Sequence, residues 1–301
     1  PPPPPPPPPP FFQAHHAIRD QPRSRGLGDV YKRQAVTAYD YTFAKLAELA
    51  NIDIILVGDS GAMVMFGYEN TTPATMEEML LMTKAVSRGA KKSLLVADMP
   101  FMSYHVSIEE SIRNAGKFVK DSGMDAVKLE GDADIAKTIR AITKTGIPVM
   151  AHIGLKPQTA KSWGGYRLQG TTYSSAKKLI EDAQELESAG AFCIVLEMVT
   201  KEISKLITES ISIPTIGIGS GSDCDGQILV LHDMLNLYDS IKPSFVKQYA
   251  DIKTETLKAL TNYKEDVVSG QFPDEKHSTS IDSSELNKLK KYFGRIKQAE
   301  I

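Results

Sequence analysis

The chain has 301 residues, of which 42% are apolar, so it is long enough to bury the core of one large α/β domain. Its 35 basic residues against 37 acidic residues leave no strong field of either sign, which argues against nucleic acid or an anionic membrane as a partner. Two cysteines without metal or disulfide spacing, and no apolar run of membrane-spanning length, fit a cytoplasmic protein. We therefore expect a small-molecule partner.

The first 34 residues do not show a globular pattern. They open on a run of prolines and continue without a hydrophobic period. We expect residues 1–34 to be a non-native or disordered segment, with a proline-rich arm that binds a partner as the alternative. The globular pattern begins at Ala35.

Short apolar runs alternate with longer helical patterns from Ala35 onward. Helical segments such as 76–90 and 108–124 carry apolar residues at three- and four-residue spacing. The pattern predicts a single (β/α)8 TIM barrel over residues 35–270, with a doubly wound open sheet as the alternative. We expect residues 271–301 to be a C-terminal tail with an amphipathic helix. The eight predicted strands lie in 35–40, 52–59, 93–100, 126–131, 148–155, 192–199, 214–221 and 226–233.

Six of these strands end at or near an acidic or polar residue. In a barrel such strand ends converge on one rim, which is the catalytic face of this fold. Any single residue of this kind can instead cap a helix or lie in a solvated loop, and Asp40, which precedes a helical pattern, is expected to be a cap. The six residues are Asp40, Asp59, Asp98, Glu130, His152 and Glu197.

Three of the rim carboxylates suggest a magnesium site. Asp59, Asp98 and Glu130 follow consecutive strands and offer the hard oxygen ligands that Mg²⁺ prefers, without His or Cys at ligand spacing. Mg²⁺ held there could bind a 2-oxo acid and stabilise its enolate. Glu197, at the end of another apolar strand, is the candidate base, because apolar surroundings would raise its pKa.

Two further residues of the rim and one glycine turn each allow two interpretations. Lys128 lies two residues before Glu130 and so on the same face of its strand, where it could neutralise a substrate carboxylate or only pair with Glu130. His152 could bind and orient the substrate, or be a structural histidine beside a carboxylate. The glycine turn 219–221 could present N–H groups to an anion or be a tight connection.

The run Gly58-Asp59-Ser60-Gly61 matches the nucleophile signature of chymotrypsin-like serine proteases. Those proteases are all-β and usually disulfide-bonded, whereas this run ends a strand in an alternating chain with two cysteines. We therefore do not expect Ser60 to be a nucleophile.

The chain resembles the ketopantoate hydroxymethyltransferases over residues 36–277. The stretches that carry the resemblance include VTAYDYTFAKLAE, ILVGDS, LLVADMPFMSY, VKLEG, HIGLKPQ, GGYRLQG and DGQILVLHD. The resemblance implies a (β/α)8 barrel that transfers a hydroxymethyl group from 5,10-methylenetetrahydrofolate to 3-methyl-2-oxobutanoate. The product is 2-dehydropantoate, which serves pantothenate and coenzyme A biosynthesis. It also implies a homo-oligomer, commonly a decamer.

Carried over by position, the resemblance implies a role for each rim residue. Asp59 and Asp98 would bind Mg²⁺, with Glu130 completing the metal site. Ser60, Asp59, Asp98 and Lys128 would contact the 2-oxo acid, and Glu197 would accept the proton. The chain departs from the family at Gly61-Ala62 and at Tyr68, so loop behaviour or folate affinity can differ.

Two other functions compete with this one. A barrel of the phosphoenolpyruvate mutase or isocitrate lyase type also holds Mg²⁺ at rim acids and handles 2-oxo acid enolates. A catalytically inactive barrel kept as a scaffold is the other alternative, and it would be indicated by loss of a rim acid, none of which is missing.

Overall fold

The computed structural model describes residues 32–160, 165, 167–238 and 243–299. The chain divides into two compact units, and the boundary between them in the sequence lies after Tyr249. The first unit holds all the predicted strands and is described first.

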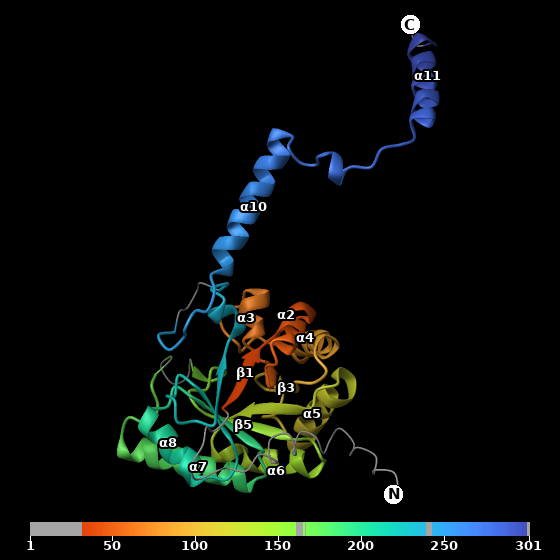
Figure 1. Ribbon diagram of the computed structural model, residues 1–301. Helices are drawn as coiled ribbons and strands as arrows, with labels where there is room; N and C mark the ends of the chain where they lie inside the picture. Colours follow the sequence, from red (N-terminus) through yellow and green to blue (C-terminus); the bar gives the residue numbers. More distant parts are fainter. Residues whose placement is uncertain (1–31, 161–164, 166, 239–242, 300–301) are drawn as a thin grey trace, which may run out of the picture. The chain divides into compact units, whose positions relative to one another are not determined.

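Eight parallel strands close into a barrel in chain order (Figure 1). β1 pairs with both β2 and β8, with Val36 beside Ile55 on one side and Leu229 on the other, so the sheet has no edge. This confirms the predicted TIM barrel and excludes the open sheet. The strands are β1 Arg33–Thr37, β2 Ile54–Val57, β3 Leu94–Asp98, β4 Ala126–Glu130, β5 Val149–Gly154, β6 Cys193–Glu197, β7 Thr215–Ile218 and β8 Gly226–Leu229.

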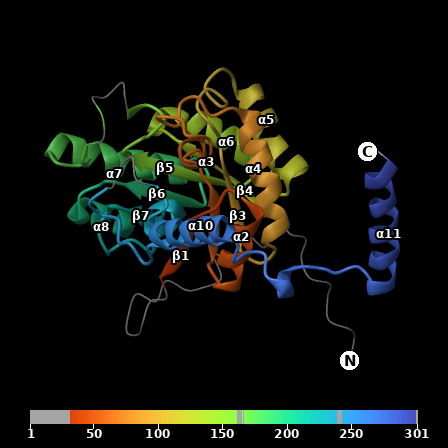
Figure 2. The same cartoon turned by 90° about the horizontal axis from the view of Figure 1, so that it is seen from above.

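Helices follow the strands and surround the barrel (Figure 2). Several begin at the capping residues that the sequence supplies: Thr75 forms a capping box with Glu78, and Ser107 accepts from the N–H of Glu110. The helices of this unit are α2 Tyr41–Leu49, α3 Gly61–Phe66, α4 Met76–Gly89, α5 Ile108–Ser122, α6 Ala136–Lys144, α7 Tyr173–Ser188, α8 Lys201–Ser210 and α9 Leu231–Met234.

The alternation of side chains along each strand divides the core into two layers. Outward-facing residues such as Val127 and Leu129 pack against the helices in one cluster. Inward-facing residues such as Ala126, Met150 and Val195 fill the barrel in a second cluster. Lys128 and Glu130 share the parity of Ala126, so this register directs both charged side chains toward the barrel interior.

The ends of the barrel differ from the expected limits. β1 begins at Arg33, two residues before Ala35, and Arg33 pairs with Gly226 of β8. The predicted N-terminal segment otherwise lies outside the described residues as far as residue 31. The first unit ends at Tyr249, whereas the barrel was predicted to extend to residue 270.

The second unit contains two helices joined by a segment with one 3-10 turn. They are α10, Ile252–Ser269, and α11, Ser283–Ala299, which is the helix expected in the tail. Across both units, none of the described helices combines the length and apolar content needed to cross a membrane.

Candidate active site

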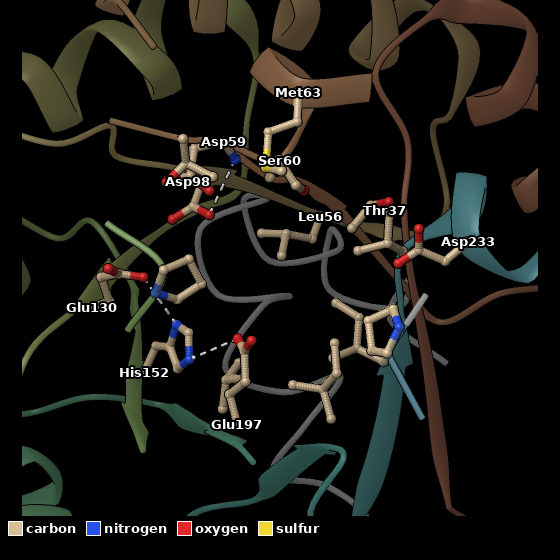
Figure 3. Close-up of a pocket in the computed structure, with 18 of the residues that line it drawn as sticks. Thr37, Leu56, Asp59, Ser60, Met63, Asp98, Glu130, His152, Glu197 and Asp233 are labelled. Carbon is tan, nitrogen blue, oxygen red and sulfur yellow. Dashed lines mark hydrogen bonds and ion pairs between the residues drawn. The ribbon is translucent and has the colours of Figure 1, made fainter. Parts of the chain in front are cut away.

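The carboxyl ends of the strands surround a cavity of about 280 Å³ (Figure 3). Of the six predicted rim residues, five line it together with Lys128. Asp40 lies elsewhere, because its side chain caps α2 by accepting from the N–H of Phe43 at 2.9 Å, as expected. The predicted residues that share the cavity are Asp59, Ser60, Asp98, Lys128, Glu130, His152 and Glu197.

Asp98 and Lys128 form a buried ion pair on neighbouring strands. Lys128 Nζ donates to both carboxylate oxygens of Asp98 at 2.8 Å, and the two side chains are 6% and 2% exposed. The N–H of Asp59 also donates to Asp98 at 3.3 Å. Lys128 thus pairs with Asp98, not with Glu130 as one reading of the sequence allowed.

Negative charge exceeds positive charge in this cavity. Burial, and then the charge of Asp98, raise the pKa of Asp59 to about 7. Burial alone would lower the pKa of Lys128, but the charges of Asp98, Glu130 and Asp59 raise it. Among the described residues that line the cavity, Lys128 is the single Lys or Arg. A further cation would therefore be stabilised here.

A divalent cation fits the donors at Asp59 and Asp98. These adjacent carboxylates supply the one or two direct ligands that Mg²⁺ usually takes, and water or substrate fills the other positions. Within the described residues, no three His, Cys, Asp or Glu side chains are grouped closely enough to hold one metal ion. Glu130 as the third ligand stays a prediction.

Gln158, in the loop after β5, connects several of the rim residues. Its amide donates to Asp59 Oδ2 at 2.9 Å and to the carbonyl of Met99 at 3.0 Å, and its backbone N–H donates to Glu130 Oε1 at 2.7 Å. The hydroxyl of Tyr104 donates to Gln158 Oε1 at 2.7 Å. This residue was missed in the sequence, although HIGLKPQ, which ends at Gln158, was among the family-like stretches.

Replacing Gln158 tests whether this network holds Asp59 in position. We expect Gln158→Met to lower magnesium affinity roughly 10- to 100-fold, as loss of an outer-shell partner typically does. Gln227→Met is the control, because its exposed amide also loses one hydrogen bond, to the carbonyl of Gly221. Isothermal titration with Mg²⁺ measures the effect, and equal affinity in the two variants would contradict the assignment.

His152 lies between two carboxylates from different strands (Figure 3). Its Nδ1 is 3.5 Å from Glu130 Oε2 and its Nε2 is 3.2 Å from Glu197 Oε2. Burial, and then the charge of Lys128, hold the pKa of the imidazole well below its usual range, so the ring is neutral. Neither ring nitrogen makes a well-aligned hydrogen bond within the described structure. His152 therefore packs beside Glu197 without an ion pair at neutral pH.

Glu197 lies in surroundings that raise the pKa of its carboxyl group. Its side chain is 15% exposed, ends β6 and points into the cavity (Figure 3). Burial raises its pKa to about 7, while the charge of Lys128 lowers it by less. Gly154 at the end of β5 allows the backbone to lie close to Glu197 of β6, because a Cβ atom at position 154 would stand 2.3 Å from the carbonyl oxygen of Glu197.

Ser60 bonds to a tyrosine, not to a base. Its Oγ lies 2.9 Å from the hydroxyl of Tyr39, a buried residue at the end of β1 that the sequence did not single out. Burial raises the pKa of Tyr39, so the hydroxyl stays protonated and can donate. Within the described part of the chain, the hydrogen bond of the Ser60 side chain is thus to this tyrosine and not to a base.

The glycine turn after β7 is a tight connection. Ser220 Oγ donates to the carbonyl of Leu196 at 2.7 Å and accepts from the N–H of Val199 at 3.1 Å. Gly219 has φ +63°, and a Cβ atom there would stand 2.7 Å from the ring of Phe245. The turn thus seats Phe245, which lines the cavity.

Comparison with known proteins decides the family. The profile described as ketopantoate hydroxymethyltransferase matches residues 27–275. The chain belongs to the ketopantoate hydroxymethyltransferase family. It is 54% identical over 263 residues to the 3-methyl-2-oxobutanoate hydroxymethyltransferase of Nitrosopumilus maritimus, covering 87% of this chain and 94% of that one. The Clostridioides difficile protein of the same name is 52% identical over 258 residues, with 86% and 94% covered. The chain is thus related to transferases of this family over most of its length.

Two solved structures with a similar fold illustrate the likeness of the barrel. A 2,3-dimethylmalate lyase, a member of the PEP mutase/isocitrate lyase superfamily, has a TM-score of 0.58 and 14% identity, covering 96% of this chain and 98% of that one. Phosphonopyruvate hydrolase in complex with oxalate and Mg²⁺ has the same score and identity, with 97% and 98% covered. At this identity the likeness shows the barrel fold alone.

The structure shows what surrounds Gly61 and Tyr68, two positions at which the sequence departs from the family pattern. Gly61 faces Met82 and Tyr39, and a Cβ atom there would stand 2.7 Å from Met82 Sδ and 2.8 Å from the Tyr39 ring. The hydroxyl of Tyr68 donates to Glu78 Oε1 at 2.6 Å, which ties the loop after α3 to α4. A larger residue at position 61 would therefore require the side chains of Met82 and Tyr39 to move.

Proposed function

We propose that the chain is a magnesium-dependent 3-methyl-2-oxobutanoate hydroxymethyltransferase that takes its one-carbon unit from 5,10-methylenetetrahydrofolate. The observation that carries the proposal is the position of Glu197. A carboxylate with a pKa near neutrality faces the same cavity as the Asp98–Lys128 pair and the Asp59 carboxylate. A base and an anion-binding group thus meet around one substrate-sized space.

Lys128 and the hydroxyl of Ser60 would bind the 2-oxo acid. Lys128 keeps its charge, and Asp98 fixes its ammonium group from β3, so its remaining donor can attract the substrate carboxylate. The hydroxyl of Ser60 lines the cavity and could donate a hydrogen bond to the substrate or accept one from it. The hydroxyl of Tyr39 is its partner within the protein. When bound at Asp59 and Asp98, Mg²⁺ would supply Lewis-acid stabilisation of negative charge on the keto oxygen.

Glu197 would remove the proton from C3 of the oxo acid, and C3 would then bond to the methylene carbon of the folate as one of its two C–N bonds breaks. Water would supply the hydroxyl group as the other C–N bond breaks and tetrahydrofolate leaves. His152 is neutral and its Nε2 lies 3.2 Å from Glu197 Oε2, so its ring restricts the position of the carboxylate without neutralising it. His152 is proposed as a residue that also contacts the substrate. Glu130, whose pKa burial raises well above its usual range, is proposed to complete the metal site from its place beside His152.

The pKa of Glu197 predicts the pH dependence of proton removal. Because the deprotonated carboxylate is the base, the rate of deuterium exchange at C3 should rise about tenfold per pH unit below about 7 and level off above it. NMR of 3-methyl-2-oxobutanoate in D₂O at saturating Mg²⁺ measures the rate. An exchange rate that falls as the pH rises through this range would exclude Glu197 as the base.

The transfer itself is tested with both substrates. We expect wild-type protein with Mg²⁺, 3-methyl-2-oxobutanoate and 5,10-methylenetetrahydrofolate to form 2-dehydropantoate, detected by mass spectrometry. The lyase alternative predicts cleavage of substrates such as 2,3-dimethylmalate, and the inactive scaffold predicts no product from either. Cleavage without transfer would favour the lyase and remove the proposal.

We also propose a homo-oligomer. Apolar side chains of α10, including Leu257, Leu260 and Tyr263, are 56 to 60% exposed in the single chain. Exposed apolar surface of this kind commonly marks protein contacts. Light scattering coupled to size exclusion gives the mass directly, and a mass equal to that of one chain would contradict the proposal.

A further inference from the structure

A carboxylate on the opposite wall of the cavity is not used by the chemistry described above. Asp233 belongs to α9, directly after β8, and points into the cavity beside Thr37 of β1 (Figure 3). In the closed barrel, β1 and β8 lie across from β4 and β5, which carry Glu130 and His152. Asp233 is therefore separated from the rim acids by the space in which the substrate would lie.

The carboxylate of Asp233 is unpaired among the residues that the structure describes. Within the described residues no hydrogen bond or ion pair to its carboxylate is present, and it is part-buried. Burial raises its pKa to about 6. A part-buried carboxylate without a donor is costly, so a ligand that brings donors to it would gain binding energy.

The surface around Asp233 is mostly apolar, with the hydroxyl groups of Thr37, Tyr238 and Ser244 as further polar groups of the cavity lining. The cavity wall here contains no charged side chain other than Asp233 among the described residues. Phe245 is seated over Gly219, where the absence of a Cβ atom makes room for its ring. Such a wall can stack a heteroaromatic ring, while the carboxylate at its edge selects the polar pattern of that ring. The apolar residues on this side are Ile218, Ile228, Val230, Pro243 and Phe245.

We infer that Asp233 binds the 2-amino-4-oxopyrimidine edge of the folate co-substrate. That edge presents two parallel N–H donors, the ring N3–H and the 2-amino group, which match the two oxygens of one carboxylate. The inference rests on the proposed function and names the subsite for its second substrate. It places the folate ring on the β7–β8 side and the oxo acid on the β2–β6 side, so the one-carbon unit lies between them.

The test compares Asp233→Asn and Asp233→Ala with wild type and with Asp223→Asn, a control at an exposed aspartate outside the cavity. Affinity for tetrahydrofolate is measured by titration calorimetry with Mg²⁺ and 3-methyl-2-oxobutanoate present. We expect both Asp233 variants to bind roughly 10- to 100-fold more weakly, the effect of losing charged hydrogen bonds, and the control to bind as wild type does. Unchanged affinity in both Asp233 variants would overturn the inference.

A second readout separates ring recognition from a structural role. Wild type should prefer a tetrahydropterin over its 2-desamino analogue, and Asp233→Ala should lose that preference. Deuterium exchange at C3 needs no folate, so it should change far less than tetrahydrofolate affinity. An equal loss of both, or a preference that survives in Asp233→Ala, would contradict the inference. Failure of the proposed function is distinct, because it would show as absent exchange in the wild type.

Discussion

Glu197→Gln should lower deuterium exchange at C3 of 3-methyl-2-oxobutanoate by at least about 100-fold, the lower end of what a general base contributes. Glutamine keeps the shape of the side chain, but its amide cannot accept the proton from C3. Glu197 is not part of the Asp59–Asp98 pair, so magnesium affinity should stay within about twofold of wild type. NMR in D₂O and calorimetry with Mg²⁺ measure the two quantities.

A matched control for this variant is Glu202→Gln, an exposed glutamate in the first turn of α8. Its exchange rate should equal that of wild type. Normal exchange in Glu197→Gln would assign the base elsewhere, and a parallel loss of magnesium affinity would show that the substitution had disturbed the whole cavity.

Asp98→Asn should weaken the binding of both Mg²⁺ and the oxo acid. The substitution removes a proposed direct ligand and one charge of the buried pair with Lys128, so we expect a loss at least as large as the roughly 10- to 100-fold effect of an outer-shell change. Lys128 would remain beside the charges of Asp59 and Glu130, which still favour its ammonium form. Calorimetry with Mg²⁺, and with the oxo acid at saturating Mg²⁺, measures both affinities.

The comparison for Asp98 is Asp132→Asn. Asp132 also pairs with a lysine, since its carboxylate lies 2.8 Å from Lys156 Nζ, but it does not line the cavity. The Asp132→Asn variant should bind Mg²⁺ and the oxo acid with wild-type affinity. Retention of wild-type magnesium affinity in Asp98→Asn would remove Asp98 from the metal site.

The barrel could be predicted from the sequence because its elements are periodic. Eight apolar runs separated by helical patterns leave few topologies, and the acids at the strand ends then share a rim whatever the details of packing. Alternation within β4 was enough to direct Lys128 and Glu130 inward. These features depend on local order along the chain, which a single sequence contains.

The partners of those residues could not be predicted in the same way. Lys128 of β4 bonds to Asp98 of the neighbouring strand β3. Gln158 bonds to Asp59, which is 99 residues away in the chain. Tyr39 reaches Ser60 because β1 pairs with β2, and Asp233 lies on the far wall because barrel closure brings β8 beside β1. Pairing of this kind is set by tertiary geometry and has no signature in residue spacing.

The central claim is that metal, oxo acid and Glu197 act together in one cavity before any folate is needed. The direct measurement is C3 deuterium exchange by wild-type protein with 3-methyl-2-oxobutanoate alone, with and without Mg²⁺. The account predicts exchange that requires Mg²⁺ and stops when the metal is chelated. Exchange that is unaffected by chelation, or absent at saturating Mg²⁺, would contradict it.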